Sequence, residues 1–416
     1  MAESSKRRRI STTKGKPKYS SSSWSDLPTE LLELILKKLS FVDIIPFKAV
    51  CSSWRSAAAQ LQSQYHSIQI TPWLMLPNDQ EDDYTSRCFL NLAENKVYKF
   101  ENAFEFEGLG NDPWCVGSSH GWLVILDDEA NPLVFNPFSR VQIELPLFPN
   151  EFNPIMIQFS RKKLITKAVL LADPSRCKNF VVVVIYGFPS RLAFCKHGDT
   201  TWTYLSDTAD QVYRDIICHN NQLYALDDNL SVKVWDFQGP SPNEIMTIPP
   251  LTLLKDVDSS RKFSRDICVS TQIYLVKTSS ELLFIERFIR KSFKELSTED
   301  GTQTVVCSYS TKMFYVFKLN LREQRWEKLE SLNDQVLFLG GNQSISFSGL
   351  DVFNRCKPNS IYFTDDKWND EYDTEFSYGG HDVGLFNLDD QSITHFFDSD
   401  LEKIDQPPLW ITPNPW

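Results

Sequence analysis

Apolar residues near the N-terminus recur with the period of a helix. Leu31, Leu32, Ile35, Leu36 and Leu39 are spaced i, i+1, i+4, i+5 and i+8, which puts them on one face of a helix. A proline stands before them at position 28, where the missing N–H of a first-turn proline costs nothing. The pattern predicts a helix that begins near this proline and carries an apolar face.

Two more helices are expected directly after the first. The segment from Ser40 to Asp43 resembles a capping box, which starts a helix by satisfying its free backbone N–H groups. Pro46 is expected in or near the first turn of that second helix, because an interior proline costs about 3 kcal/mol. A third helical stretch runs from about Val50 to Leu61. Three short helices enclose a core too small to be very stable alone, so the unit is expected to need a partner.

After about residue 67 the helical period disappears. Short alternating or aliphatic runs take its place, separated by clusters of Asn, Asp, Gly, Pro and Ser, and this pattern predicts strands. Clear examples are residues 122–126, 181–186, 223–226 and 314–317. The larger part of the chain is therefore predicted to be all-β.

A weak repeat divides the β region into units, each with two strands joined by a polar turn. The marker positions are Leu123, Tyr224, Tyr274, Tyr315 and Tyr362, with one further unit expected around residues 181–194. The period of about 40–50 residues is that of radial repeats. We therefore predict a six- or seven-bladed β-propeller, to which the region before residue 120 could add a blade. A pair of sheets in a β-sandwich is the alternative.

Composition excludes several classes of protein. The chain has 416 residues, 42% apolar and 23% charged, which is the balance of a soluble globular protein with a small module and a large domain. Its longest aliphatic run, Val181–Tyr186, is far shorter than the roughly 20 residues of a membrane helix. The basic N-terminus lacks the apolar stretch of a signal peptide. The nine cysteines form no Cys-x-x-Cys pair, which indicates reduced thiols in the nucleus or cytoplasm.

Charge is distributed unevenly along the chain. Residues 1–23 carry +6 and the whole chain −11, which leaves −17 on the remainder, so nucleic-acid binding by the folded part is not expected. The same N-terminal segment is rich in Ser, Thr, Lys and Arg and is predicted to be a disordered tail. Within it, Lys6, Arg7, Arg8 and Arg9 are a candidate nuclear-import signal, with a solvated basic tail as the alternative.

Residues that could carry catalysis are sparse. The six histidines show no metal-binding spacing, and no nucleophile elbow or Cys/His pair occurs, so no catalytic residue, metal or cofactor is predicted. His120-Gly121 is interpreted as strand-entry packing, in which the glycine allows close approach of the backbone. Gly340-Gly341-Asn342 is interpreted as a turn rather than an anion cradle, because no Lys-Ser/Thr follows it.

An acidic run in the C-terminal part is interpreted as a solvated loop. It consists of Asp365, Asp366, Asp370, Glu371, Asp373 and Glu375. A calcium site or a contact with a basic partner is the alternative, although the run lacks the alternating pattern of a calcium loop.

The N-terminal helical segments together resemble an F-box. Leu27-Pro28 opens a Leu/Ile-rich helix, and the segment from Val50 to Arg55, which reads Val-Cys-Ser-Ser-Trp-Arg, follows about twenty residues later. Lys48 stands where the family often has Arg. The resemblance implies binding to a Skp-family adaptor, which joins the F-box to a cullin and a RING subunit. The residues expected to form the adaptor surface and the small core behind it are Leu27, Pro28, Leu31, Leu32, Ile35, Leu36, Val50, Cys51 and Trp54. A helical cap docked on the β domain is the alternative.

The rest of the chain resembles the β domain that follows F-boxes in a large plant family and has no assigned function. The segments that carry this resemblance are residues 118–123, 136–140, 337–342, 359–366 and 408–413. The repeat is kelch-like in its period, but it lacks the double glycine of kelch units. Trp-Asp, the mark of WD repeats, occurs only at Trp235-Asp236.

These observations predict an α+β multidomain protein with a basic tail at residues 1–23, an F-box at 24–66 and a propeller-like substrate-recognition domain at 67–416. The resemblance implies a substrate-receptor subunit of a Skp–cullin–F-box ubiquitin ligase, which recruits an unidentified target protein and is not itself an enzyme. Neither a membrane nor a nucleic acid is an expected partner. The alternatives are a small-ligand sensor or enzyme built on the β domain, and a nuclear F-box scaffold that acts outside a ligase.

Overall fold

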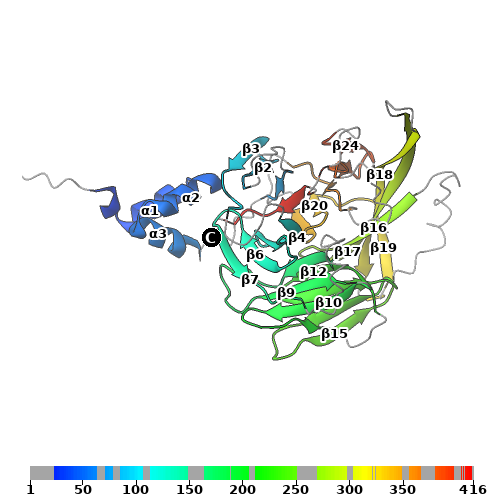
Figure 1. Cartoon of the computed structure of the whole chain (residues 1–416), viewed down its shortest axis with the longest axis horizontal. Helices are drawn as coiled ribbons and strands as arrows, with labels where there is room; N and C mark the ends of the chain where they lie inside the picture. The colour runs from blue at the N-terminus through cyan, green and yellow to red at the C-terminus, as the bar shows by residue number, and fades with distance from the viewer. Residues whose placement is uncertain are drawn as a thin grey trace, which may run out of the picture. The chain divides into compact units, whose positions relative to one another are not determined.

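The computed structural model describes most of the chain and divides it into two compact units, residues 1–66 and 67–416 (Figure 1). The described ranges are 23–62, 71–77, 85–105, 113–148, 164–187, 189–205, 211–250, 269–297, 303–320, 322–323, 325–348, 356–366, 380–397, 404, 406 and 408–414. The predicted basic tail, Ser23 excepted, and the candidate nuclear-import signal lie outside these residues.

The first unit consists of helical elements, as the apolar period predicts. They are η1 (Trp24–Asp26), α1 (Thr29–Leu36), α2 (Phe41–Ala49) and α3 (Ser52–Gln62). Pro28 is the N-cap of α1. The helix ends at Leu36, short of the predicted Leu39, because the next residues tighten into i→i−3 bonds, with the Leu39 N–H donating to Leu36 O at 3.1 Å.

The start of α2 follows the predicted cap, but its proline does not lie where we expected. The Ser40 hydroxyl accepts from the Asp43 N–H at 3.4 Å, and the helix begins at Phe41. Pro46 is therefore interior, beyond the first turn. The lost backbone bond is offset by packing on both sides of the proline, where Ile44 and Phe47 are buried.

The described strands of the second unit form six β-sheets. The first sheet contains β25 (Leu409–Ile411), β1 (Trp73–Met75), β2 (Arg87–Asn91) and β3 (Lys96–Phe100), in that order. The next contains β4 (Trp114–Ser119), β5 (Trp122–Leu126), β6 (Pro132–Asn136) and β7 (Val141–Glu144). The third contains β8 (Ile165–Leu170), β9 (Val181–Tyr186), β10 (Arg191–Lys196) and β11 (Thr203–Tyr204).

The other three sheets follow in chain order. The fourth contains β12 (Tyr213–His219), β13 (Gln222–Asp227), β14 (Val232–Asp236) and β15 (Asn243–Ile248). The fifth contains β16 (Val269–Lys277), β17 (Leu282–Ser297), β18 (Gln303–Asn320) and β19 (Arg325–Leu329). The sixth contains β21 (Ile345–Ser348), β20 (Gln335–Leu339), β22 (Ser360–Phe363), β23 (Gly384–Asn387) and β24 (Ile393–His395), in that order, with β20 and β22 parallel.

The sheets are the blades of a six-bladed β-propeller. One edge strand of each blade contacts the corresponding strand of the next blade, in the order β25, β4, β8, β12, β16 and β21. The ring closes between the sixth and first blades, where the rings of Phe338 on β20 and Trp410 on β25 lie 5.1 Å apart. The prediction of a propeller is confirmed with six blades, and the sandwich alternative is wrong.

Two of the predicted repeat units fall in one blade. The markers Tyr274 and Tyr315 lie on β16 and β18 of the fifth sheet. The first blade instead combines the two ends of the unit, because β25 pairs with β1 and places Trp410 opposite Leu74. The expected unit around residues 181–194 is confirmed as β9 and β10 of the third sheet.

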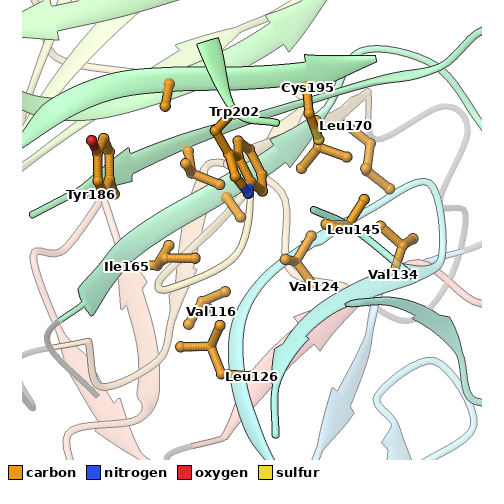
Figure 2. Packing of buried hydrophobic residues seen from close by; sticks show 14 of the residues in the cluster. Val116, Val124, Leu126, Val134, Leu145, Ile165, Leu170, Tyr186, Cys195 and Trp202 are labelled. Carbon is orange, nitrogen blue, oxygen red and sulfur yellow. The ribbon is translucent and has the colours of Figure 1, made fainter. Parts of the chain in front are cut away.

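The hydrophobic core of the propeller lies between adjacent blades. Figure 2 shows one such layer, in which Val124 and Leu126 of the second blade face Ile165, Leu170 and other residues of the third. Strands such as β5 and β9 are buried along their whole length, since each has a neighbouring blade on either face. In the sequence, a continuous aliphatic run therefore indicates an inner strand of a blade.

Candidate functional sites

The helical unit leaves large apolar side chains exposed. Leu31 is 46% exposed, Leu34 55% and Val50 54%, and Trp24 is more exposed still. Exposed apolar side chains at this density are typical of a surface that binds another molecule rather than of one that stays in contact with solvent.

The nine predicted adaptor residues divide between surface and core. Leu32 and Leu36 are almost completely buried inside the unit and cannot contact a partner directly. The exposed residues are Pro28, Leu31 and Val50, and those partly buried are Leu27, Ile35, Cys51 and Trp54. Leu34, which was not among the predicted residues, is also exposed.

Aromatic contacts hold the exposed elements in place. The Trp54 Nε1–H donates to the carbonyl oxygen of Trp24 at 3.1 Å, which joins η1 to α3. The rings of Phe47 and Trp54 lie 4.5 Å apart. Trp54 therefore acts mainly by fixing α3 against α2 and η1, and its remaining exposure leaves it available at the edge of the surface.

Lys48, the residue that departs from the family pattern, lies close to a second cation. The Arg55 Nε–H donates to the carbonyl oxygen of Lys48 at 3.2 Å. Burial and the positive charge of Arg55 lower the pKa of Lys48. A basic edge next to exposed Val50 suits a partner that combines apolar and acidic residues.

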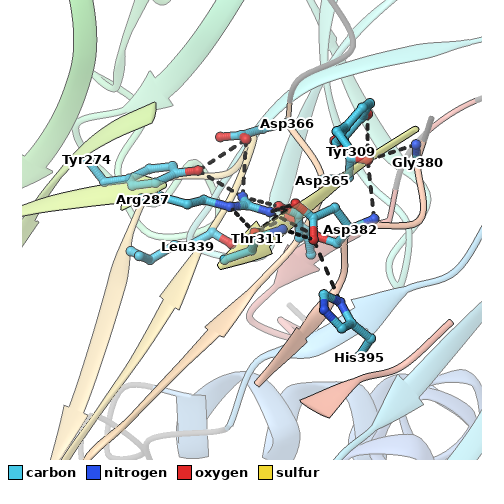
Figure 3. Close-up of polar contacts among 11 residues, drawn as sticks. Tyr274, Arg287, Tyr309, Thr311, Leu339, Asp365, Asp366, Gly380, Asp382 and His395 are labelled. Carbon is cyan, nitrogen blue, oxygen red and sulfur yellow. Dashed lines mark hydrogen bonds and ion pairs between the residues drawn. The ribbon is translucent and has the colours of Figure 1, made fainter. Parts of the chain in front are cut away.

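The propeller contains a buried ionic network around Arg287, shown in Figure 3. This side chain is only 1% exposed. Its Nη2–H donates to Asp382 Oδ2 at 3.0 Å and its Nε–H to Thr311 Oγ1 at 2.7 Å. Burial lowers the pKa of Arg287, but the neighbouring Tyr274, Asp382 and Asp366 raise this pKa by more, so the guanidinium stays charged.

The network extends from Arg287 to both sides. On one side the Tyr274 hydroxyl donates to Asp366 Oδ1 at 3.1 Å. On the other, Asp365 Oδ2 accepts from the Tyr309 hydroxyl and the Gly380 N–H, both at 2.8 Å. These contacts join the fifth and sixth blades at the base of the long β17–β18 hairpin.

A second buried ion pair joins the third, fourth and fifth blades. Lys167 Nζ on β8 lies 2.5 Å from Asp215 Oδ1 on β12, and the Leu275 N–H on β16 donates to Asp215 Oδ2 at 2.6 Å. Burial raises the pKa of Asp215, with Lys167 acting in the opposite direction. Both oxygens of this carboxylate are thus used within the protein.

Neither a metal centre nor a membrane-spanning helix is found among the described residues. They contain no group of His, Cys, Asp and Glu side chains that could hold a metal ion, and no helix among them is long and apolar enough to cross a membrane. Cys51, Cys115, Cys177, Cys195, Cys218 and Cys356 form no disulfide. Burial raises the pKa of Cys115, Cys195 and Cys218 to about 12, so these thiols are poor nucleophiles.

The two glycine motifs have the structural roles that the sequence suggests. Gly121 has φ +83°, and an added Cβ would lie 2.3 Å from the Asn414 Cβ, so close backbone approach requires glycine there. Gly340 and the two residues after it form the bend between β20 and β21. A Cβ on Gly340 would lie 1.8 Å from Thr364 Oγ1.

The interpretation of the acidic run as a solvated loop is wrong for its first two residues. Asp365 is 2% exposed, and the Asp366 side chain is 9% exposed. Hydrogen bonds support their burial: the Tyr309 hydroxyl and the Gly380 N–H donate to Asp365 Oδ2, and Tyr274 and Arg287 donate to Asp366 Oδ1. Residues 370–375 lie outside the described residues.

Sequence reasoning missed the buried charges. Lys167 interrupts the mainly apolar strand β8, and Arg287 closely follows the apolar run at residues 282–285 of β17, which is the one signal that could have singled them out. A charge at such a position must be paired, and the partner comes from another blade.

The fold and the exposed helical surface define a class: a small helical docking module followed by a six-bladed propeller. Residues 24–63 match the F-box domain, and residues 89–387 match the family described as the KIB1-4 beta-propeller. The chain belongs to the F-box proteins with a KIB1-4 β-propeller.

Similar proteins include several from Arabidopsis thaliana. Putative F-box protein At4g22660 is 25% identical over 94% of this chain and 97% of its own length. F-box protein SKIP23 is 24% identical, with 94% and 95% covered. Among solved structures, an oligogalacturonate lyase in complex with manganese matches 76% of this chain and 75% of its own, with 10% identity and a TM-score of 0.30.

Proposed function

We propose that this chain is the substrate-receptor subunit of a Skp–cullin–F-box ubiquitin ligase. In this role the F-box docks on a Skp-family adaptor, the propeller holds a target protein, and other subunits carry out the transfer of ubiquitin. The chain contributes positioning rather than bond chemistry.

The observation that carries the proposal is the exposed apolar surface of the F-box unit. Leu31 and Val50 are each about half exposed, while Leu32 and Leu36 of the same unit are buried. Covering a large aliphatic side chain contributes roughly 1.5–3 kcal/mol, so a partner that covers several gains substantial affinity. The match of residues 24–63 to the F-box domain supports an adaptor of the Skp family as that partner.

The adaptor surface can be tested with charge substitutions at exposed positions. In the full chain, the double variant Leu31→Asp/Val50→Asp should weaken binding to a purified Skp-family adaptor at least thirtyfold, or about 2 kcal/mol. Ser56→Asp/Ala59→Asp is the matched control, because it adds the same two charges at exposed positions of α3 outside the predicted surface. Isothermal titration calorimetry gives both affinities, and equal affinity of Leu31→Asp/Val50→Asp and wild type would refute the docking surface.

A second measurement separates the ligase from a scaffold that acts outside it. The chain and adaptor are mixed with a cullin and a RING subunit and analysed by gel filtration. Co-elution of all four supports the ligase proposal. An adaptor complex that excludes the cullin would instead favour the scaffold.

We also propose that Lys6, Arg7, Arg8 and Arg9 direct the chain to the nucleus. The basis is their charge alone. A fluorescent fusion in which all four are alanine should shift from nucleus to cytoplasm, and an unchanged distribution would mean that the segment is an ordinary basic tail.

A further inference from the structure

A polar cavity of about 420 Å³ lies against the first strands of the third, fourth and fifth blades. The bend after β20 and Asp366, which follows β22, complete its wall. The lining residues are Thr166, Lys167, Ser190, Tyr213, Arg214, Asp215, Ser270, Thr271, Gln272, Ile273, Tyr274, Gly340, Gly341 and Asp366. Four blades therefore contribute to one site.

The charges in this wall are already paired inside the protein. Asp215 is bonded to Lys167 and to the Leu275 N–H, as described above. Asp366 faces Arg287 at 3.4 Å, and Arg214 forms an ion pair with Asp228 at 2.5 Å. A ligand with a full charge of either sign would therefore have to displace an existing partner, which disfavours charged ligands.

Hydrogen-bonding capacity nevertheless remains on both sides of the cavity. Tyr274 and Arg287 both contact Oδ1 of Asp366, and Oδ2 has no hydrogen-bond partner among the described residues. Within the same residues Lys167 uses its Nζ only for Asp215, which leaves N–H donors. Thr271 adds an exposed hydroxyl and Gln272 a partly exposed amide.

The wall also has few exposed apolar side chains that could contact an apolar ligand or the hot-spot residues of a protein partner. Ile273 is the one aliphatic side chain among the residues that line it, and it is 8% exposed. The rings of Tyr213 and Tyr274 are buried, at 2% and 1% exposure. Protein interfaces are centred on exposed aromatic and aliphatic anchors, which this site lacks.

We propose that the cavity binds a small, uncharged, polyhydroxylated molecule of the size of a sugar or cyclitol. Ligand hydroxyls donate to Asp366 Oδ2 and accept from Lys167, and others exchange hydrogen bonds with Thr271 and Gln272. Such a ligand satisfies these remaining hydrogen-bonding groups without breaking any of the three ion pairs. The proposal goes beyond the ligase function and does not depend on it.

Ligand binding is tested on the full chain in complex with its adaptor, or on the full chain alone. Glucose, galactose, sucrose and myo-inositol are the probes, with glycine, lysine and glutamate as charged comparators. Saturation-transfer NMR and calorimetry should detect saturable binding of at least one hydroxylated probe. Absence of binding by all four, or binding of the charged comparators alone, would overturn the proposal.

Two adjacent carboxylates provide the matched variants. Asp366→Asn replaces the acceptor that lines the cavity and should weaken binding about tenfold or more. Asp365→Asn alters the neighbouring buried carboxylate, which does not line the cavity, and should leave affinity within about twofold. Equal affinities of these two variants would refute the site.

A variant at an exposed position is also needed, because Asp366→Asn and Asp365→Asn both change buried residues and could unfold the protein. Thr271→Val removes an exposed hydroxyl and keeps the shape of the side chain. It should weaken binding about three- to tenfold without changing the melting temperature. Unchanged affinity in Thr271→Val and in Asp366→Asn together would place any observed binding elsewhere on the molecule.

Discussion

The F-box unit exposes large apolar side chains, whereas the propeller buries most of its own. Ten large apolar side chains are exposed among the described residues, and four of them, Trp24, Leu31, Leu34 and Val50, belong to the small unit at residues 23–62. The propeller buries entire strands between neighbouring blades. A short helical unit cannot cover its own apolar surface, whereas a closed ring of blades can.

Charged side chains show the reverse arrangement. In the F-box unit, residues 23–60, every charged side chain is exposed or half-buried. The propeller encloses Lys167 with Asp215 and Arg287 with Asp382. The first unit therefore depends on something outside itself for its apolar groups, and the second depends on internal partners for its charges.

The largest expected effect comes from two adjacent leucines in α1. Leu32→Asp places a charge at a position that is 1% exposed, where it should cost at least about 4 kcal/mol and unfold the F-box unit. Leu31→Asp, at a half-exposed position, should leave the unit folded. Hydrogen exchange followed by mass spectrometry should show lost protection in residues 29–62 for Leu32→Asp alone, with the propeller strands unchanged in both. Equal exchange in the two variants would contradict the division between core and surface.

The propeller should fail instead when a buried charge loses its partner. Arg287→Met leaves Asp366 and Asp382 without their cation and should lower the free energy of unfolding by about 3–5 kcal/mol. The control is Arg325→Met, because Arg325 is exposed and pairs with Glu323 and Glu327 at the surface, where the loss should stay below about 1 kcal/mol. Urea denaturation of both variants measures the difference, and similar losses would mean that the buried network contributes no more than a surface pair.

A pair of glycines tests how tightly the blades approach. Gly121 and Gly198 both have positive φ, at +83° and +90°, but only Gly121 is crowded by Asn414 and Thr412. Both alanine variants carry backbone strain of about 1 kcal/mol, and Gly121→Ala should lose about 1–3 kcal/mol more from steric overlap. Thermal unfolding compares the two, and equal melting temperatures would show that the close approach carries no stability.

Local pattern was sufficient to predict the helices but not the position of every residue in them. Ser40 caps α2 as expected, because a cap depends on neighbours in the sequence. Pro46 was misplaced because the rule against interior proline considers the helix alone. The burial of Ile44 and Phe47, which supports that turn, depends on the packing of the whole unit.

The assembly of the blades was less accessible from the sequence. The β16–β17 and β18–β19 hairpins resemble separate repeat units, although they form one sheet. The closing blade pairs Trp73 with Ile411, and no local pattern connects residues so far apart. Period predicts that blades exist, but pairing between the ends decides which strands form them.

The ionic network was missed for a related reason. Arg287 contacts the Thr364 carbonyl oxygen at 2.8 Å and the Asp382 carbonyl oxygen at 3.0 Å, across two blades. A charged residue is ordinarily interpreted as solvent-facing, and Asp365 and Asp366 were interpreted as part of a solvated loop. Only the three-dimensional structure brings these groups together.

The smallest expected effect is a pH dependence that comes from Asp366. Burial raises the pKa of this carboxyl above its ordinary value of 3.8, with Arg287 and Lys167 opposing the rise. The folded protein then binds the Asp366 proton more tightly than the unfolded chain does, so ionisation of this group destabilises the fold. The free energy of unfolding of wild type, relative to that of Asp366→Asn, should be highest at pH values below 3.8. This difference should fall as the pH rises through the pKa of folded Asp366.

Urea denaturation of both proteins at intervals from pH 3 to pH 7 measures this difference, and the subtraction removes the other carboxyl groups that titrate in common. A difference that increases with pH would mean that Arg287 and Lys167 outweigh burial, and that Asp366 belongs with the groups stabilised by their charge. Ionisation of Asp366 would then stabilise the propeller, and the attraction between its buried charges would exceed the cost of burying them.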